Sequence, residues 1–146
     1  MNFSDAVRSS LRQYANFSGR ARRAEYWYFT LFSILVQVAL SVIFAVVGSA
    51  ADAAGVRDGS TASSTVGIVG IVLVFGSSLA LLLPSLAVTC RRLHDTDHSG
   101  WWVLMAVVPF ASVVLFVFEL LDSSAGSNRY GPNPKGVEVP MSSSWA

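Results

Sequence analysis

Three long apolar segments alternate with polar ones along this chain of 146 residues, and Asp, Glu, Lys and Arg are absent from 26–51, 59–90 and 99–118. Apolar runs of about 20 residues are typical of helices that cross a bilayer, whose hydrocarbon core is about 30 Å thick. The polar segments between them predict connecting loops. The pattern predicts transmembrane helices over 27–48, 66–90 and 101–121, loops over 49–65 and 91–100, and a polar tail over 122–146.

A basic lead-in, residues 1–26, precedes the first of these segments. Four apolar residues in it recur at three- and four-residue intervals, so they share one face of a helix, with Arg8 and Arg12 on an adjoining side and Ser4 as a candidate N-cap. This predicts a short amphipathic helix lying in the lipid interface. An amphipathic helix packed on protein is the alternative. The four residues are Phe3, Val7, Leu11 and Tyr14.

Composition supports a membrane protein of a single domain, residues 1–146. Apolar residues make up 53% of the chain, charged residues only 13%, and the mean hydropathy is +0.54. A soluble domain carries about 25% charged residues, so this chain has too few to cover a surface facing water. The single cysteine, Cys90, excludes an internal disulfide and is expected to be a buried apolar side chain. The predicted fold class is all-α: a polytopic membrane helical bundle of about three transmembrane helices with a short N-terminal interfacial helix.

The positive charges predict an orientation, because Lys and Arg near membrane spans stay preferentially in the cytoplasm. On a model with three spans, the N-terminus and the loop 91–100 are cytoplasmic and the tail lies on the opposite side. If the third segment were a re-entrant hairpin centred on Pro109, the tail would return to the cytoplasmic side. The residues on the cytoplasmic side of the model with three spans are Arg8, Arg12, Arg20, Arg22, Arg23, Arg91 and Arg92.

Two motifs carry most of the information: FSGRARRAEYW at 17–27 and RRLHDTDHSGWW at 91–102. Both are predicted at the cytoplasmic face, where Tyr26, Trp27, Trp101 and Trp102 would form an aromatic belt. Acids and arginines of the two motifs can pair, Glu25 with Arg91 or Arg92, and Asp95 with Arg20, Arg22 or Arg23. The surplus positive charge predicts binding of anionic lipid headgroups or of a partner protein. The predicted cluster is Arg20, Arg22, Arg23, Glu25, Trp27, Arg91, Arg92, His94, Asp95, Trp101 and Trp102.

These motifs, with Pro84, Pro109 and the tail motif NRYGPNP at 128–134, resemble the small bacterial inner-membrane proteins of the YhaH/YhaI type, a domain family of unknown function. The resemblance runs from Phe17 to Pro134 and implies a membrane domain in the bacterial inner membrane. The tail residues that carry it are Asn128, Arg129, Tyr130 and Gly131. It implies no activity, so no catalytic residue is carried over. The long loop over 49–65 and the residues Asp97 and His98 depart from the family's pattern.

Other functions are less consistent with the sequence. His94 and His98, four residues apart, would share a face if helical and could suggest a metal site, but Ser99-Gly100 favours a turn, so neither a metal nor another cofactor is expected. His94 and Asp95 could form the acid–base pair of a membrane enzyme, although no matching nucleophile is visible. A small oligomeric transporter or channel component is another alternative, weakened by the lack of an ionisable residue deep within a span. Nucleic-acid binding is not expected. The chain is therefore predicted to be non-enzymatic, associating with membrane lipids and with a membrane protein or a second copy as the other candidate partners.

Overall fold

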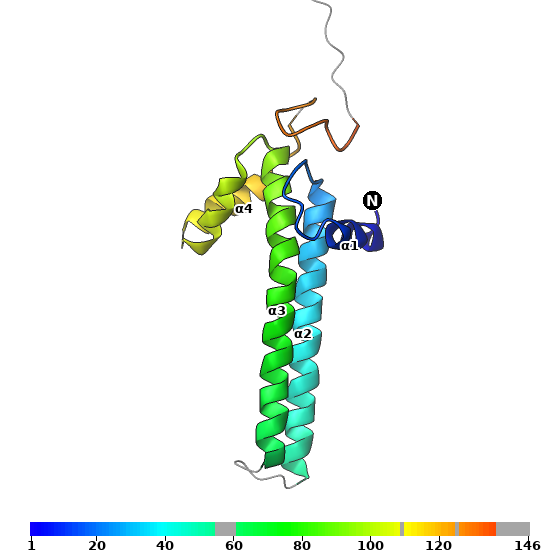
Figure 1. Cartoon of the computed structure of the whole chain (residues 1–146), viewed down its shortest axis with the longest axis vertical. Helices are drawn as coiled ribbons and strands as arrows, with labels where there is room; N and C mark the ends of the chain where they lie inside the picture. The colour runs from blue at the N-terminus through cyan, green and yellow to red at the C-terminus, as the bar shows by residue number, and fades with distance from the viewer. Residues whose placement is uncertain (55–60, 109, 125, 137–146) are drawn as a thin grey trace, which may run out of the picture. The chain divides into compact units, whose positions relative to one another are not determined.

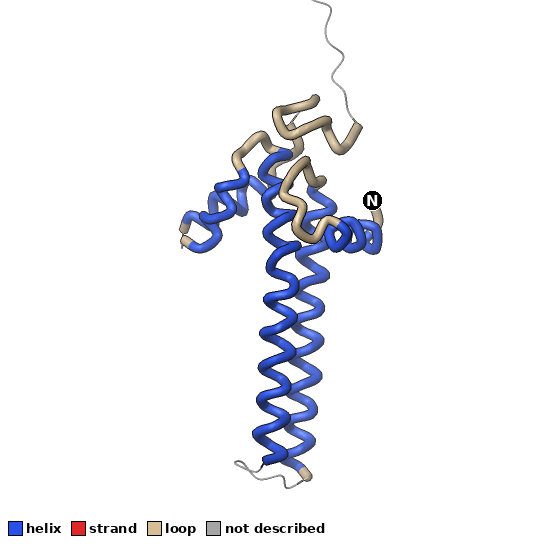
Figure 2. Tube along the Cα trace, in the orientation of Figure 1, coloured by secondary structure: helices blue, strands red, loops and turns tan. Residues whose placement is uncertain are grey.

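The computed structural model describes residues 1–54, 61–108, 110–124 and 126–136. Within these ranges all regular structure is helical, apart from one isolated β-bridge between Asn128 and Gly131, as Figure 2 shows. The predicted all-α fold class is confirmed. The elements are α1 (Phe3–Arg12), α2 (Arg23–Ala53), α3 (Thr61–Asp95), the 3₁₀ helix η1 (Gly100–Val107) and α4 (Ala111–Leu120), coloured along the chain in Figure 1.

The chain divides into two compact units whose boundaries pass through the two long helices. One unit consists of Met1–Phe29 and Pro84–Ala146, and the other of Thr30–Leu83. The first, called here the polar unit, contains α1, the first turns of α2, the last turns of α3, η1, α4 and the tail. The second, called here the apolar unit, contains the long apolar portions of α2 and α3.

In the apolar unit, α2 and α3 run alongside each other (Figure 1). One polar side chain of each helix meets the other, since Gln37 Nε2 donates to Ser77 Oγ at 3.3 Å. Further along, Gly70 lies against the Phe44 ring so closely that a Cβ there would be 3.0 Å from Phe44 Cδ1. A hydrogen bond between spans and a small residue at their closest approach are usual ways for membrane helices to associate.

Both long helices are apolar enough and long enough to cross a bilayer. α2 has 31 residues and α3 has 35. At about 1.5 Å per residue, each exceeds the hydrocarbon thickness of about 30 Å, so the ends of each helix project beyond it. The predicted spans 27–48 and 66–90 lie inside these helices.

Both predicted loops next to these spans are shorter than expected. Residues 49–53 continue α2 and 61–65 belong to α3, because alanine and serine there are compatible with a helix; residues 55–60 lie outside the described part. At 91–100, α3 continues through Asp95 and ends only where Asp97 adopts a positive φ of 61°. The RRLHD segment is therefore the last turn of a helix, and the prediction of a loop there is wrong.

The third apolar segment is two short elements instead of one helix over 101–121. η1 and α4 pack against each other as a hairpin (Figure 1), and Pro109 between them lies outside the described residues. α4 has ten residues, too few to cross a bilayer. After α4 the chain returns to the end of α3, where Ser124 N–H donates to Asp95 O at 2.9 Å. This arrangement agrees with the alternative of a hairpin for the segment. The side of the membrane on which the tail lies stays a prediction.

The N-terminal helix α1 forms where the apolar spacing predicts it. It begins one residue after Asn2, and Asp5 Oδ2 accepts a hydrogen bond from the Asn2 backbone N–H at 3.4 Å. Asn2 is the N-cap, so the prediction of Ser4 is wrong by two positions. On the side of α1 that faces the polar unit, Ala6 and Ser10 are fully buried, while Phe3 and Leu11 are each 40% exposed.

Candidate functional site

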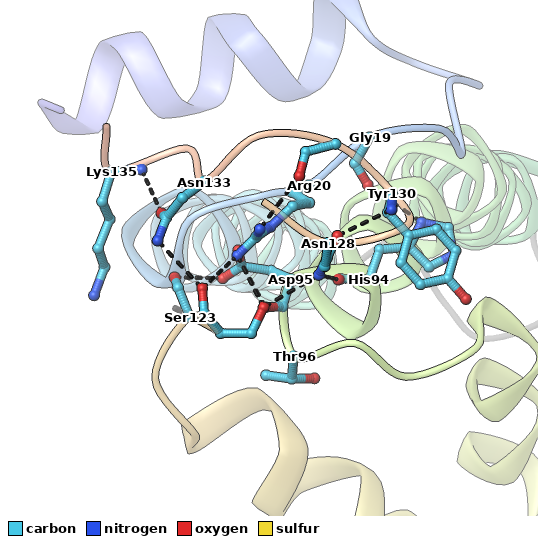
Figure 3. Close-up of polar contacts among 12 residues, drawn as sticks. Gly19, Arg20, His94, Asp95, Thr96, Ser123, Asn128, Tyr130, Asn133 and Lys135 are labelled. Atoms are coloured by element: carbon cyan, nitrogen blue, oxygen red, sulfur yellow. Dashed lines mark hydrogen bonds and ion pairs between the residues drawn. The ribbon is translucent and has the colours of Figure 1, made fainter. Parts of the chain in front are cut away.

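The centre of the polar unit is a buried carboxylate, Asp95, which has no exposed surface. Arg20 Nε donates to Asp95 Oδ1 at 2.8 Å, and Arg92 and Ser123 both donate to Asp95 Oδ2. The Arg20 and Arg92 side chains are themselves only 1% and 0% exposed. Two arginines therefore share one acid away from water, and Figure 3 shows Arg20 reaching Asp95 from the N-terminal segment.

Arg20 also binds the tail through main-chain oxygens. Its Nη1 donates to Gly126 O at 2.8 Å and its Nη2 donates to Ser124 O at 2.9 Å. Arg92 Nη2 donates to Leu121 O. These carbonyls disperse positive charge that Asp95 alone cannot balance, since every donor of a buried guanidinium needs an acceptor. The cluster thus holds the N-terminal segment, the end of α3 and the tail together.

A second buried pair lies beside α1. Arg91 Nη1 donates to Glu25 Oε1 at 3.1 Å, and Glu25 is only 5% exposed. Ser9 Oγ donates to the same Glu25 oxygen at 3.0 Å, and Gln13 Oε1 accepts from Arg91 Nη1 at 3.0 Å. Arg91 Nε and Nη2 are buried with no acceptor among the described residues. The pair fixes α1 against the start of α2 and the end of α3.

Both predicted ion pairs are therefore confirmed. Glu25 pairs with Arg91, and Asp95 pairs with Arg20. Asp95 also pairs with Arg92, which lies three residues before it on the same helix. We define the arginine cluster as Arg20, Glu25, Arg91, Arg92 and Asp95. Ser9, Gln13 and Ser123, which complete it, were missed, because short polar side chains carry no distinctive pattern in the sequence.

His94 belongs to the same turn but is directed to other partners. Its ring stacks on Tyr130 with the centroids 3.8 Å apart, its Nδ1 lies 3.2 Å from Gly19 O, and its Nε2 lies 3.7 Å from Cys90 Sγ. Cys90 is buried, as expected. Both ring nitrogens of His94 thus face groups of the fold, while Asp95 is taken up by arginines. This geometry offers the two residues no shared proton.

The second histidine, His98, lies beside a different aromatic ring. It stacks on Phe118 of α4 with centroids 4.0 Å apart, and its Nδ1 lies 3.0 Å from Thr96 Oγ1. In the described ranges, His, Cys, Asp and Glu nowhere gather in a group of three or more suited to a metal ion.

The tail motif closes over the end of α3. Asn128 Nδ2 donates to His94 O at 2.8 Å (Figure 3). The backbones of Asn128 and Gly131 bond to each other. Arg129 lies 3.4 Å from Asp97, with both side chains more than half exposed. The motif therefore belongs to the same site as the two arginine motifs.

A further contact within the tail is exposed. Lys135 donates to Asp122 Oδ1, and the Ser123 backbone N–H donates to the same oxygen at 2.8 Å. Both hydrogen bonds lower the pKa of Asp122. Since Asp122 is exposed, this contact marks the water-facing rim of the polar unit.

Of the aromatic residues predicted to form a belt, two pack on α4 and one is largely exposed. Trp27 packs edge-on against Phe116 of α4 at 5.9 Å between centroids, and Trp102 packs similarly on Phe118 at 5.4 Å. Trp101 is 78% exposed. Their common position in an aromatic belt stays a prediction.

Several cations remain outside the buried pairs. Arg8 and Arg12 are exposed on α1, one helical turn apart, while Arg22 and Arg23 are half-buried. Arg8 and Arg12 line a pocket of about 500 Å³ together with Asp5, Ser9 and Gln13. Ser9 and Gln13 also contact the Glu25–Arg91 pair, so this pocket adjoins the arginine cluster.

Comparison with known proteins agrees with the membrane assignment. The family model for DUF805, a protein family of unknown function, matches residues 14–132. Inner membrane protein YhaI of Escherichia coli (strain K12) is 43% identical over 131 residues, covering 87% of this chain and 92% of YhaI. Inner membrane protein YhaH of the same strain is 35% identical over 127 residues, covering 86% of this chain and 92% of YhaH. No solved structure is significantly similar to the chain.

The matched range contains both arginine motifs and the start of the tail motif. With two long apolar helices and relatives named inner membrane proteins, the chain is an integral membrane protein. It belongs to the DUF805 family, as the resemblance of its motifs predicted.

Proposed function

We propose that this protein is a non-enzymatic, multi-pass inner-membrane protein whose polar unit binds anionic lipid headgroups at the cytoplasmic face, through exposed arginines of α1. The observation that carries the proposal is the pair Arg8 and Arg12, exposed one turn apart beside a polar pocket. Guanidinium groups form paired hydrogen bonds with phosphate oxygens and are the usual side chains for that ligand.

Because the arginine cluster is buried, its arginines are not accessible to lipid headgroups, although the sequence predicted them as the binding residues. Arg20, Arg91 and Arg92 are at most 2% exposed and face carboxylates of the chain itself. Their role in the proposal is to hold α1 and the tail in place. The cations available to lipid are those of α1 and, to a smaller extent, Arg22 and Arg23.

The apolar side of α1 favours the same placement. Phe3 and Leu11 stay 40% exposed although the helix is packed on the polar unit, and Phe3 meets Tyr28 edge-on at 5.9 Å between centroids. A helix with exposed apolar residues on one side and arginines on another is suited to the boundary between headgroups and acyl chains.

The cytoplasmic orientation follows from the distribution of charge. Because the tail contacts Arg20 directly, Arg129 and Lys135 lie on the same side as the N-terminal arginines. Nine of the ten Lys and Arg residues of the sequence belong to the polar unit. The rule that positive residues stay inside makes that side the cytoplasm.

Native mass spectrometry of the detergent-solubilised protein with phosphatidylglycerol and phosphatidylethanolamine tests the proposal. We expect preferential binding of phosphatidylglycerol, and each of R8Q and R12Q should weaken it about fivefold, since one basic residue near an anionic surface contributes about 1 kcal/mol. R129Q with K135Q is the control, because both cations are at the surface of the polar unit, pair with Asp97 and Asp122, and do not line the pocket of α1. Equal affinity for the two lipids, or equal loss in the control, would remove the proposal.

A further inference from the structure

The hairpin of η1 and α4 has an unusual surface for a segment attached to a polar unit. Val107 is 82% exposed and Phe110 is 88% exposed, and Trp101 at the start of η1 is 78% exposed. Between Ser99 and Phe118 the sequence contains no Asp, Glu, Lys or Arg. A surface this apolar is unstable in water, so another apolar medium must cover it.

We propose that this hairpin enters the hydrocarbon of the cytoplasmic leaflet and leaves on the side where it entered, so that the acyl chains of a single leaflet cover it. The proposal extends the lipid contacts of the protein from headgroups to acyl chains. It rests on the hairpin itself and is independent of the arginines of α1.

Both ends of the hairpin lie beside the last turns of α3, since a Cβ on Gly100 would overlap Cys90 Sγ. Its first residue, Gly100, follows the end of α3 by five positions, and Ser99 caps it by accepting from Trp101 N–H. At its other end, Arg92 Nε donates to Glu119 O at 3.4 Å and Arg92 Nη2 donates to Leu121 O. The hairpin therefore starts and ends at the same depth, beside charged groups that stay at the membrane surface.

The length of each arm matches one leaflet. The eight residues of η1 rise about 2.0 Å each and the ten residues of α4 about 1.5 Å each, so both arms are about 15 Å long. Half of a hydrocarbon core of about 30 Å is the same length. An arm perpendicular to the membrane would reach the bilayer centre and no further.

The backbone of the hairpin is compatible with hydrocarbon, where unpaired polar groups are costly. Around the tip, Val108 N–H donates to Met105 O, Ser112 N–H to Val108 O and Val113 N–H to Phe110 O, at 3.1 to 3.2 Å. The described turn thus keeps donors bonded inside the hairpin. Ser112, the only hydroxyl side chain in α4, is partly covered.

The distribution of exposed residues favours lipid over a protein partner. In α4 the exposed positions are 113, 114, 116, 117 and 120, and the buried ones are 115 and 119. At about 100° per residue these exposed positions cover about 160° of α4. In η1 every residue of 101–107 except 103 is exposed, so the exposed surface of the hairpin continues around that arm, as expected for a segment surrounded by acyl chains. A docking face for a second copy would instead be confined to one stripe.

At the mouth of the hairpin, where η1 begins and α4 ends, the side chains are amphipathic rings instead of purely apolar groups. His98 and Trp102 both pack on Phe118, next to the last turn of α4. Rings with a polar edge are stable at the level of the headgroups. The order from mouth to tip is therefore amphipathic, then apolar, which is the order of polarity across one leaflet.

Spin labels on single cysteines test the depth of the hairpin. Four single-cysteine variants are made in a C90A background and reconstituted into vesicles of phosphatidylethanolamine and phosphatidylglycerol. They are V107C and V113C at the tip, W101C at the mouth, and I34C in α2 as a reference. We expect the ratio of oxygen to nickel-chelate collisions at 107 and 113 to match that at 34, and the label at 107 to lie about 12 Å deeper than the label at 101. Tip labels exposed to the nickel chelate would overturn insertion, and low oxygen access that rises on dilution with lipid would show a second copy as the occupant.

Sidedness is measured in the same background with N16C and S127C, both at exposed positions of the polar unit. In inside-out and right-side-out membrane vesicles, a membrane-impermeant maleimide should modify both from the same compartment. Modification from opposite compartments would mean that the segment crosses the bilayer, which overturns the hairpin. Neither result depends on lipid headgroup charge, so the outcome is separable from that for Arg8 and Arg12.

Discussion

Replacing the buried acid Asp95 by asparagine is the sharpest test of the arginine cluster. The substitution D95N keeps the size and shape of the side chain and removes its charge. Arg20 and Arg92 would then remain buried with no carboxylate between them, since their side chains are 1% and 0% exposed. Their carbonyl acceptors in the tail persist but carry only partial charge.

The size of the effect follows from this burial. Breaking a buried ion pair by removing one partner costs about 3–5 kcal/mol, because the charge left behind is poorly solvated. The matched control is D97N, two residues along. Asp97 pairs with Arg129 at 3.4 Å, but these side chains are 55% and 60% exposed, and such exposed pairs contribute about 0–1 kcal/mol. The two variants should therefore differ by at least about 2 kcal/mol in the free energy of unfolding.

The assay is reversible unfolding in mixed micelles of a mild detergent and sodium dodecyl sulfate, followed by helical circular dichroism and tryptophan fluorescence. Trp27 and Trp102 pack on α4 and so report the polar unit directly. If D95N unfolds at the same detergent fraction as D97N, the buried pairs do not exist as described and the reasoning fails.

Two further predictions concern close packing. G100A should destabilise by about 1–3 kcal/mol, because its Cβ would overlap the Cys90 Sγ, and adding C90A should restore part of the loss in the same unfolding assay. In the apolar unit, G70V should weaken the pairing of α2 with α3, because its Cβ would lie 3.0 Å from Phe44 Cδ1, whereas G76V has no described atom within 4 Å of its Cβ. Equal unfolding of the two valine variants would contradict that contact.

The sequence was most informative where composition and charge decide the structure. Apolar runs located α2 and α3 because hydrocarbon accepts only segments with satisfied backbone and few charges. The pairing of Glu25 and Asp95 with arginines was predictable because a carboxylate that leaves water needs a cation. Which of Arg91 and Arg92 pairs with Glu25 was not predictable. The two side chains point in different directions around the helix axis, and the direction that faces Glu25 depends on tertiary packing.

The third apolar segment shows the limit of this reasoning. Hydropathy counts apolar residues, and one long helix has the same count as two short elements that fold back on each other. The sequence did contain hints of a break, in Pro109 and in the cations Arg129 and Lys135 of the tail. The contacts of Arg20 with tail carbonyls were out of reach, because every residue supplies the same main-chain oxygen.

The reach of Arg20 across the chain has a consequence for biosynthesis. Its bond to Gly126 joins residues 106 positions apart, so this contact cannot form until most of the chain has left the ribosome. Both long helices are complete before then, whereas the main-chain oxygens of the tail that accept from Arg20 and Arg92 are synthesised later. The polar unit is therefore completed late, after α2 and α3 have inserted into the membrane. A chain truncated before residue 124 should still insert, but the end of α3 would lack its contacts with the tail. We expect membrane quality-control proteases to degrade it.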